Sequence, residues 1–538
     1  MSREHPEMPH QSSPAGLPSK DSTKSFWHTE PSPLLLAHRS TRNLPATADV
    51  VIIGSGITGA SIAHHLLTRN APPPTSPDAT QPGEKHHHLD VLMLEAREAC
   101  WGATGRNGGH CQPLLFETPH DPSIGRFELA NFHALQRLIA AEAIDCEFHA
   151  QPGVRALYSE HLVQQAAEAL QVLATTAPDL RRRVRLVTEF AELVEYRIPS
   201  AKGAVVTELA GRMWPYKFVA GVLERLLTAQ DLQGSFNLQT LTPVVQLQPG
   251  RGGGGGGGGG DAGDRAGGWT IQTADRGSVH AHRVVLATNG YTSHLLPSFQ
   301  DLIVPCRGQM SALTPLASLQ GTQRLHTSLG FLGAGLEDYL IQRPDARGAH
   351  LMFGGGRQHG RSVGVTDDAG LDAATAAYLR RRLVEVLNLP EGEHDNEPGS
   401  RPAEFEAVAQ WTGIMGFSRD EYPFVGRVPP RYAMGGEDLF MAAGFTGHGM
   451  PNTWLCGAAV ARAARGSFGG GGGGGGGDGE GERVGEEEMV VEVEAGVEVR
   501  VPGVYLITEE RIRKAMEGRS VEEVDRAEME KGRVEGMG

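Results

Sequence analysis

The stretch DVVIIGSGITGASIAHHLL (residues 49–67) decides the fold. The apolar, β-branched run 50–53 is typical of a buried parallel strand, and an apolar helical segment follows it. Between the two, Gly54, Gly56 and Gly59 have GxGxxG spacing. The first glycine allows a tight turn, the second lets backbone approach a pyrophosphate, and the third allows close helix–strand packing. The stretch predicts a dinucleotide site with the pyrophosphate at the helix N-terminus.

An acidic residue at the end of the second strand would complete the nucleotide site. It is expected about 20 residues after the glycines, where its carboxylate binds the ribose hydroxyls. Residues 89–94 (LDVLML) read as that strand, and Glu95 ends it. The gap is longer than usual because the Pro-rich, polar segment 71–88 reads as a loop insertion. Its consecutive histidines read as solvated residues, so no metal site is predicted. A carboxylate at position 95 disfavours the 2′-phosphate of NADP.

Composition and charge exclude several classes of protein. The chain has 538 residues, enough for two domains, and a net charge of −15, which is wrong for binding nucleic acid or an anionic membrane surface. No apolar run approaches the length of about 18 residues that a membrane span needs, and residues 1–24 lack the apolar core of a signal peptide. The five cysteines form no CxxC motif and are odd in number, as in a reducing compartment. We therefore expect a cytoplasmic protein without nucleic-acid or membrane partners.

Hydrophobic periodicity predicts a mixture of helices and strands beyond the first unit. The predicted helices are 126–143, 161–175, 215–229 and 373–387. The predicted strands are 236–247, 269–273, 283–287, 339–342, 349–353 and 438–442. The glycine-rich run 251–268 reads as the tip of a hairpin, and the segment 467–488 reads as a linker. The pattern predicts an α/β protein whose nucleotide-binding domain is interrupted by a second, mixed domain.

Three further segments are dense in small residues. CWGATGRNGGHCQP (100–113) can turn backbone N–H groups toward an anion or a flat ring, and Arg106 adds a fixed charge. RVVLATNGYT (283–292) reads as a buried strand that ends against a nucleotide. LFMAAGFTGHGMPNTWLCGAAVARA (439–463) is a second strand–glycine–helix unit, whose helix N-terminus would stabilise negative charge.

These pieces, in this order, resemble the FAD-dependent amino acid and amine oxidase family that includes D-amino acid oxidase, glycine oxidase and sarcosine oxidase. GATGRNGGH (102–110) and GAVVTELAGRMWPYKFV (203–219) are most similar to the γ-glutamylputrescine oxidase branch. The resemblance implies an α/β fold in which a mixed α+β substrate domain interrupts a Rossmann-like FAD-binding domain. We predict the following division: FAD-binding segments 46–115, 204–300 and 410–520, substrate segments 116–203 and 301–409, and polar or charged tails 1–45 and 521–538. Residues 502–515 (PGVYLITEERIRKA) would form a closing strand and helix.

The resemblance also implies a set of cofactor-binding residues. It places the ADP half of FAD on Gly54, Gly56, Ile57, Thr58, Gly59, Glu95, Ala96 and Arg97, with Val244 against the adenine and Thr288, Asn289 and Gly290 at the neighbouring strand end. It places the pyrophosphate or the flavin ring near Thr104, Arg106, Asn107 and Gly108. It places the far end of the flavin near Gly444, Gly447, His448, Gly449 and Met450.

The implied activity is oxidation of a CH–NH bond in a small amine or amino acid. Such enzymes transfer a hydride to the flavin, the imine is hydrolysed, and oxygen or another acceptor reoxidises the flavin. Tyr339, Arg343 and His448 are the candidate catalytic residues: Tyr339 to cap the flavin, Arg343 to bind an acid group and His448 at the cofactor. Met450 stands in the stretch where sarcosine-oxidase-like members carry a lysine. Cys306 does not match the family's flavin-linking cysteine, so non-covalent FAD is expected.

Other functions compete with this interpretation. Oxidation of a hydroxy acid would use the same cofactor residues. A degenerate flavin-binding scaffold is a third possibility, although it would have no need to keep both ends of a cofactor site. A dehydrogenase that binds only NAD would not require the C-terminal glycine motif.

Overall fold

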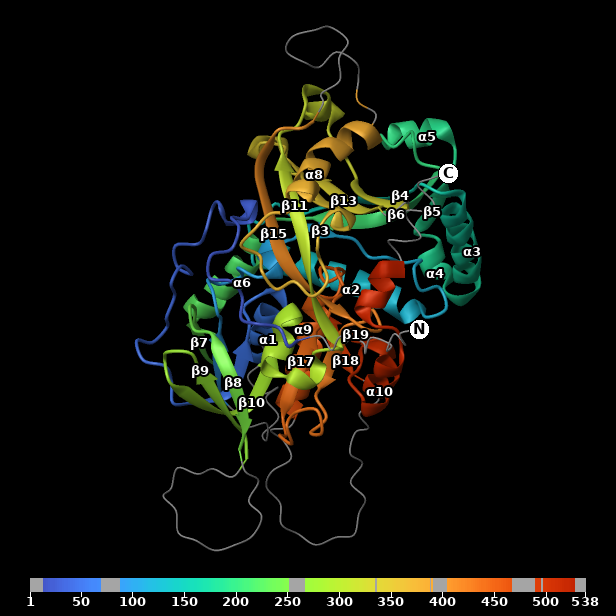
Figure 1. The fold of residues 1–538 in the computed structure, drawn as a ribbon. Coiled ribbons are helices and arrows are strands. Elements are labelled where there is room, and N and C mark those ends of the chain that lie inside the picture. Colours follow the sequence, from blue (N-terminus) through green and yellow to red (C-terminus); the bar gives the residue numbers. More distant parts are fainter. Residues whose placement is uncertain are drawn as a thin grey trace, which may run out of the picture.

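Two large β-sheets organise the chain, and helices cover them (Figure 1). The computed structural model describes residues 13–68, 88–250, 267–333, 336–387, 389, 404–466, 489–494 and 497–527. The predicted hairpin tip and linker, and most of the predicted 71–88 insertion, lie outside the described residues. Among the described residues, no helix combines the length and apolar composition that crossing a membrane would need.

The first sheet contains the predicted nucleotide-binding unit. Its strand order is β16 (Phe424–Arg427), β17 (Leu439–Ala443), β10 (Ser278–Leu286), β1 (Thr47–Ile53), β2 (Leu89–Leu94) and β7 (Gly234–Gln239), with β9 (Trp269–Thr273) pairing β10 and β8 (Val244–Pro249) pairing β9. The strands from β17 to β7 run parallel. β8 and β9 pair antiparallel across the glycine-rich run, as the hairpin prediction requires.

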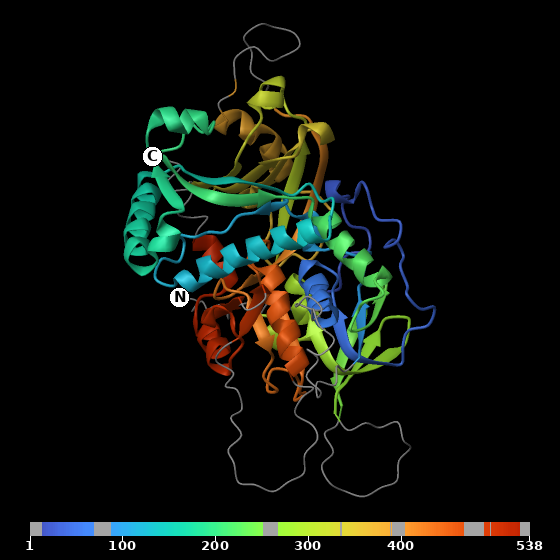
Figure 2. The same cartoon turned by 180° about the vertical axis from the view of Figure 1, so that it is seen from behind.

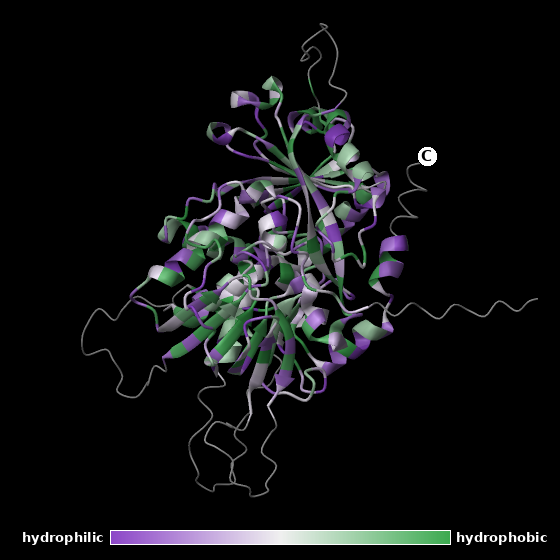
Figure 3. Cartoon of the chain, turned by 60° about the vertical axis from the view of Figure 1, so that its left-hand side comes forward, coloured by the Kyte–Doolittle hydropathy of each residue, from purple (hydrophilic) through white to green (hydrophobic). Residues whose placement is uncertain are grey.

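Both faces of this sheet are buried, which explains why its strands read as continuous apolar runs. In β1, Val50 and Ile52 belong to one core cluster and Val51 and Ile53 to another. On the first face, α1 (Ile57–Leu67) packs between α6 (Pro215–Thr228) and α9 (Thr453–Gly466). Figure 3 shows the apolar composition of these strands.

The second sheet has the order β15 (Ala407–Ser418), β11 (Ile303–Leu313), β14 (Leu351–Gly355), β13 (Leu336–Gln342), β12 (Ser328–Gly333), β4 (His149–Leu157), β6 (Gly203–Arg212) and β3 (His110–Cys111), with β5 (Val184–Val187) on β6. Its helices are α3 (Glu160–Thr176), α4 (Pro178–Arg181), α5 (Phe190–Glu195) and α8 (Ala373–Val386). The remaining elements are α2 (Pro122–Ala141), α7 (Thr292–Leu295), α10 (Glu509–Glu517) and the hairpin of β18 (Val490–Glu494) and β19 (Val497–Arg500). Figure 2 shows α2 crossing the middle of the molecule beside α9.

The predicted helices and strands are found within a few residues of their expected positions, with three corrections. The predicted strand 236–247 is two strands, β7 and β8, because Pro243 lacks the N–H that a continuous ladder needs. Residues 502–515 form a 3₁₀ turn and α10, with one isolated bridge from Leu506 to Val425 in place of a strand. β6 and β15 pair within the second sheet, although 204–212 and 410–418 were grouped with the FAD-binding segments. Alternation along a strand does not reveal its partner.

The N-terminal segment, predicted as a polar tail, enters the interior. Trp27 is fully buried, and its Nε1 donates to the Asn107 carbonyl at 2.5 Å. The Ser25 hydroxyl donates to the Gly105 carbonyl at 2.8 Å. Residues 22–27 therefore contact the turn that contains the GATGRNGGH motif.

Candidate active site

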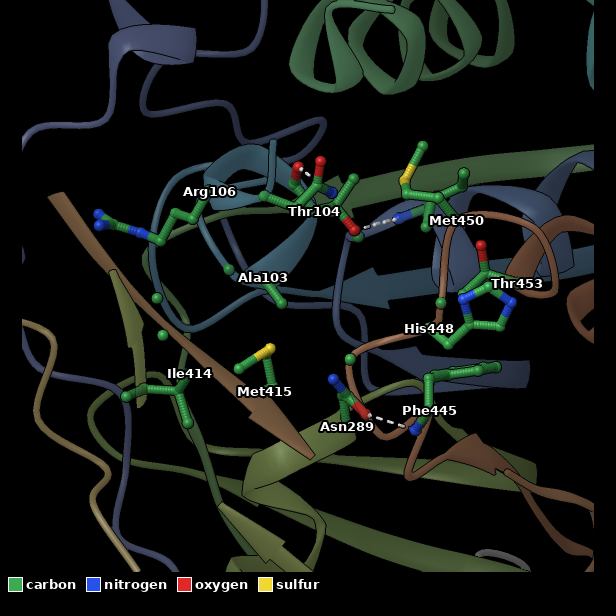
Figure 4. Close-up of a pocket in the computed structure, with 18 of the residues that line it drawn as sticks. Ala103, Thr104, Arg106, Asn289, Ile414, Met415, Phe445, His448, Met450 and Thr453 are labelled. Carbon is green, nitrogen blue, oxygen red and sulfur yellow. Dashed lines mark hydrogen bonds between the residues drawn. The ribbon is translucent and has the colours of Figure 1, made fainter. Parts of the chain in front are cut away.

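A cavity of about 440 Å³ lies where the carboxyl ends of β1, β2 and β10 meet one face of the second sheet (Figure 4). This is the position at which open parallel sheets bind ligands. All the residues predicted to bind the cofactor line the cavity, except Gly59, Gly290 and Gly444. Their binding roles remain predictions, but the structure brings them together.

The glycine turn after β1 is required by close backbone packing. Gly54 has φ +107°, and a Cβ built on it would lie 2.5 Å from the Ala287 carbonyl oxygen. A Cβ on Gly59 would overlap the Gly54 carbonyl oxygen. Gly59 therefore lies behind the cavity and allows α1 to approach β1. The N-terminus of α1 faces the cavity, with the Ile57 N–H donating to Thr104 Oγ1 at 3.1 Å.

Glu95 is held at the end of β2 by the turn that precedes α1. Its Oε2 accepts hydrogen bonds from the Ser55 N–H at 3.0 Å and the Ser55 hydroxyl at 2.6 Å. Its Oε1 accepts from the Arg97 N–H at 2.9 Å. Each carboxylate oxygen can accept more than one bond, so Glu95 can still receive ligand hydroxyls. Ser55 was not singled out from the sequence, although it lies between two glycines of the motif.

Arg97 and Arg106 share one buried carboxylate. Asp368 is fully buried and lies 2.9 Å from Arg97 Nη1 and 3.5 Å from Arg106 Nε. Arg106 also donates to the Trp101 and Thr412 carbonyls, and its guanidinium points away from His448 (Figure 4). The prediction that the Arg106 charge faces a pyrophosphate or ring does not fit this arrangement, because protein oxygens already surround the guanidinium.

The loop after β17 is tied to two distant parts of the chain. Asn289, at the end of β10, accepts hydrogen bonds from the Gly444 N–H at 3.0 Å and the Phe445 N–H at 3.5 Å (Figure 4). His448 lines the cavity, and its Nε2 lies 2.9 Å from Oε1 of Glu128 on α2. Gly444 itself lies behind the cavity with φ +79°, where it turns the chain. Gly290 does not line the cavity either. It packs against β15, where a Cβ on it would overlap the Met415 carbonyl oxygen.

Glu128 was not identified from the sequence, yet it is central to this loop. It is 2% exposed. Besides His448, it accepts from the Leu114 N–H at 2.7 Å and from Asn452 Nδ2 at 3.1 Å. One turn away on α2, Asn131 bonds the Met450 carbonyl at 3.2 Å and the Leu455 N–H at 2.9 Å. Glu128 and Asn131, on one face of α2, therefore fix the loop after β17 through hydrogen bonds.

A match over most of the chain shows the family. Residues 49–463 match the family model described as FAD dependent oxidoreductase. The chain belongs to this family.

Its relatives in the family are distant in sequence. A tRNA 5-methylaminomethyl-2-thiouridine biosynthesis bifunctional protein of Shewanella amazonensis is 24% identical over 71% of this chain, and the match spans 48% of that protein, about half its length. Gamma-glutamylputrescine oxidoreductase of Escherichia coli is 21% identical over 79% of this chain and 85% of that protein. The crystal structure of glycine oxidase from Geobacillus kaustophilus superposes with a TM-score of 0.56 and 19% identity, covering 78% of this chain and 95% of that one. The fold is therefore the α/β fold shared with glycine oxidase, as predicted.

FAD, the cofactor of this family, fits the residues present. Side chains are absent where a pyrophosphate would lie, because Gly54 and Gly56 line the cavity at the α1 N-terminus. Glu95 would receive the ribose, and the loop 447–450 would border the flavin. None of the five cysteines lines the cavity, and all are buried. This favours non-covalent FAD over attachment through sulfur.

Tyr339 lines the cavity from the second sheet, and its predicted role of capping the flavin stays a prediction. Its hydroxyl lies 3.0 Å from Met310 Sδ. A Cβ on Gly108 or Gly354 would overlap the Tyr339 side chain, so the glycines at these positions make room for it.

Arg343 does not line the cavity, although it was predicted to bind a substrate acid group. It is 3% exposed and pairs with Glu147 at 2.7 Å. Its guanidinium also packs over the rings of Phe26 and Trp214. A buried charge whose partner is this close is a structural link, so the prediction for Arg343 is corrected. The sequence does not distinguish an arginine in a buried ion pair from one that lines a pocket.

Tyr339→Phe is expected to retain FAD and to lower the rate of flavin reduction by less than about tenfold. Burial raises the pKa of Tyr339 well above its usual range, so the hydroxyl stays protonated at neutral pH and cannot act as a general base. The rate of anaerobic flavin reduction between pH 6 and 9 should therefore have the same pH dependence in both proteins. A thousandfold loss of rate would instead assign the hydroxyl a direct role in the chemistry.

Proposed function

We propose that this FAD-dependent oxidoreductase oxidises the CH–NH bond of a small amine or amino acid. The observation that carries the proposal is a single cavity bordered by both strand–glycine–helix units, which leaves the second sheet to hold a substrate against the flavin. The names of its relatives support the substrate class, since gamma-glutamylputrescine oxidoreductase and glycine oxidase both act on amines.

Bound FAD supplies a two-electron acceptor for the hydride on the carbon that bears the amine. The substrate nitrogen loses a proton, and water converts the resulting imine to a carbonyl compound and a free amine or ammonia. This chain's residues orient the substrate and exclude water. Tyr339 and Met310 cover the cavity from the second sheet, and Met415 lines it from β15.

His448 lines the cavity in the C-terminal glycine loop, where the proposal puts the far end of the flavin. Its Nε2 is held by Glu128, so Nδ1 is the nitrogen left for a ligand. Within the described part of the chain, Nδ1 makes no hydrogen bond, and the side chain is 35% exposed. In the proposed reaction Nδ1 accepts a hydrogen bond or receives a proton, because Nε2 donates its hydrogen to the Glu128 carboxylate.

The decisive experiment is anaerobic bleaching of the flavin absorbance by a panel of amines, amino acids and hydroxy acids. Bleaching by amines alone supports the proposal, and bleaching by hydroxy acids alone favours the other oxidation. Readmission of air then separates an oxidase from an enzyme that uses another acceptor. A flavin band that no compound bleaches would favour the scaffold.

Precipitating the protein with acid is expected to release all of its flavin into the supernatant. The reason is that every cysteine is buried outside the cavity, so none can be linked to the ring. The absorbance of the pellet and supernatant near 450 nm measures this directly. Flavin that stays with the pellet would contradict non-covalent binding.

The proposal also places the enzyme in the cytoplasm, which agrees with five unpaired, buried thiols.

A further inference from the structure

The N-terminal arm, which we define as residues 15–28, borders the cavity at a place where the sequence predicted no binding residue. Gly16, Leu17 and Pro18 all line the cavity, together with most of the residues predicted to bind the ADP half of FAD. Leu17 is 38% exposed, so apolar surface is open at the border of the cavity. The arm therefore contributes a wall to the cavity, although it belongs to neither large sheet.

Hydrogen bonds hold the chain on either side of these three residues. The Ala15 N–H donates to Ser293 Oγ on α7 at 2.9 Å, and both residues are buried. The Ser19 hydroxyl donates to Asp367 Oδ1 at 2.9 Å, in the loop that precedes α8. The stretch 16–18 therefore spans from a helix that follows the first sheet to a loop of the second sheet. Both bonds must break before this stretch can move away from the cavity.

The first of these bonds indicates which end of the cavity the arm covers. His294 and Leu295, the next residues of α7 after Ser293, line the cavity. Leu295 shares a core cluster with Val244 of β8, the residue predicted to lie against the adenine. An adenine ring is flat and has apolar faces, so packing against Leu17 would remove apolar surface from water. The part of FAD that suits this wall is its adenosine half.

Further along, the arm binds the buried charge cluster that also borders the cavity. Ser22 and Thr23 both accept hydrogen bonds from the Arg106 guanidinium, Thr23 at 3.2 Å from Nη1. The Thr23 N–H donates to the carbonyl of Asp368 at 2.8 Å. The Asp368 carboxylate is the one shared by Arg97 and Arg106, and both arginines line the cavity. Displacement of the arm would therefore loosen this wall as well.

We propose that the N-terminal arm is part of the FAD site: Leu17 covers the adenosine half of the cofactor, and the bonds at Ala15 and Ser19 hold it there. Release of FAD then requires the arm to move aside. The coupling is reciprocal, because an arm that retains FAD is itself held in place by FAD. The inference goes beyond the proposed function and does not depend on which bond the enzyme oxidises.

The first test is the rate at which the loaded enzyme loses FAD after dilution, followed by the flavin absorbance of the ultrafiltrate. Leu17→Asp should raise this rate at least about tenfold, because a carboxylate would replace the apolar contact and repel the phosphates. Leu36→Asp is the matched control, since Leu36 is 42% exposed in the same N-terminal segment and does not line the cavity. The control should lose FAD as slowly as the unmodified enzyme.

A second variant frees the arm without changing any residue that lines the cavity. Ser19→Ala combined with Ser293→Ala removes both anchoring bonds. Loss of FAD should become at least about fivefold faster, while circular dichroism reports unchanged secondary structure. Loss of FAD as slow as in the unmodified enzyme, both from this variant and from Leu17→Asp, would overturn the proposal.

Trypsin measures the reverse effect in the unmodified enzyme. Lys20 and Lys24 are exposed and lie on either side of Ser22 and Thr23, so cleavage after either lysine reports how often the arm leaves its position. Mass spectrometry identifies the two products. Cleavage should be at least about fivefold slower with saturating FAD than after removal of FAD by dialysis. Equal cleavage rates in the two states would overturn the proposal.

Discussion

Gly56→Val is expected to yield a folded protein that has lost at least nine-tenths of its bound FAD. Gly56 has φ −68°, which valine tolerates, so the backbone itself is not strained. Its Cβ would lie 3.0 Å from Thr104 Oγ1, and the two valine methyl groups would extend into the cavity that Gly56 lines. They would occupy the place where the pyrophosphate approaches backbone. A tenfold loss of affinity corresponds to about 1.4 kcal/mol, less than the expected cost of displacing the phosphates.

The measurement is the ratio of flavin to protein after purification, with circular dichroism as the check on folding. Gly370→Val is the matched control: a Cβ there meets no atom within 4 Å, and Gly370 does not line the cavity. The control should keep its full flavin content. Stoichiometric flavin in folded Gly56→Val would show that the cofactor lies elsewhere.

Glu128→Gln is expected to lower the free energy of unfolding by about 3 kcal/mol, although the two side chains have nearly the same shape. Three donors point at the carboxylate: the Leu114 N–H, His448 Nε2 and Asn452 Nδ2. A glutamine amide would turn an NH₂ group toward at least one of them and leave it without an acceptor. The buried location makes each lost bond costly. Because His448 would also lose its fixed orientation, flavin reduction should slow by at least about tenfold.

Denaturant unfolding and anaerobic flavin reduction measure the two effects separately. Glu192→Gln is the control for stability, because Glu192 pairs with Arg185 at the surface, where an ion pair contributes less than about 1 kcal/mol. If Glu128→Gln unfolds at the same denaturant concentration as the unmodified protein, the carboxylate does not support the loop. Unchanged reduction kinetics would remove His448 from the proposed chemistry.

The predictions that succeeded depend on short stretches of chain. The glycine turn at residues 54–59, the strand that ends at Glu95 and the second strand–glycine–helix unit are each contained in fewer than 30 residues. For Gly59 the cause is local, because a Cβ there would overlap the Gly54 carbonyl oxygen of the same turn. For Gly54 the close neighbour is the Ala287 carbonyl oxygen, which follows β10. Parallel strands buried on both faces also have a composition that is visible without a partner. For these reasons the fold class and the glycine turn that borders the cavity could be predicted.

The predictions that failed concern contacts between distant segments. The prediction that Arg343 binds substrate is wrong, because its ion-pair partner Glu147 is 196 positions away in the chain and no local pattern indicates that contact. The polar tail predicted at the N-terminus contributes Trp27 to the core. β6 and β15 were grouped with the wrong strands, because alternation identifies a buried face and not the sheet to which it belongs.

The amino-acid sequence was enough to predict a dinucleotide fold with two glycine turns, because the strand, the glycines and the helix of each unit follow one another in the chain. Which polar groups line the cavity depends on contacts between segments that are far apart in the chain. The tertiary structure pairs His448 with Glu128 across 320 positions and buries Arg343 behind the cavity. It also brings residues 16–18 to the cavity. A hydrogen bond or an ion pair forms only between groups that are close in space. The order of residues in the chain fixes that distance only within one helix, strand or turn.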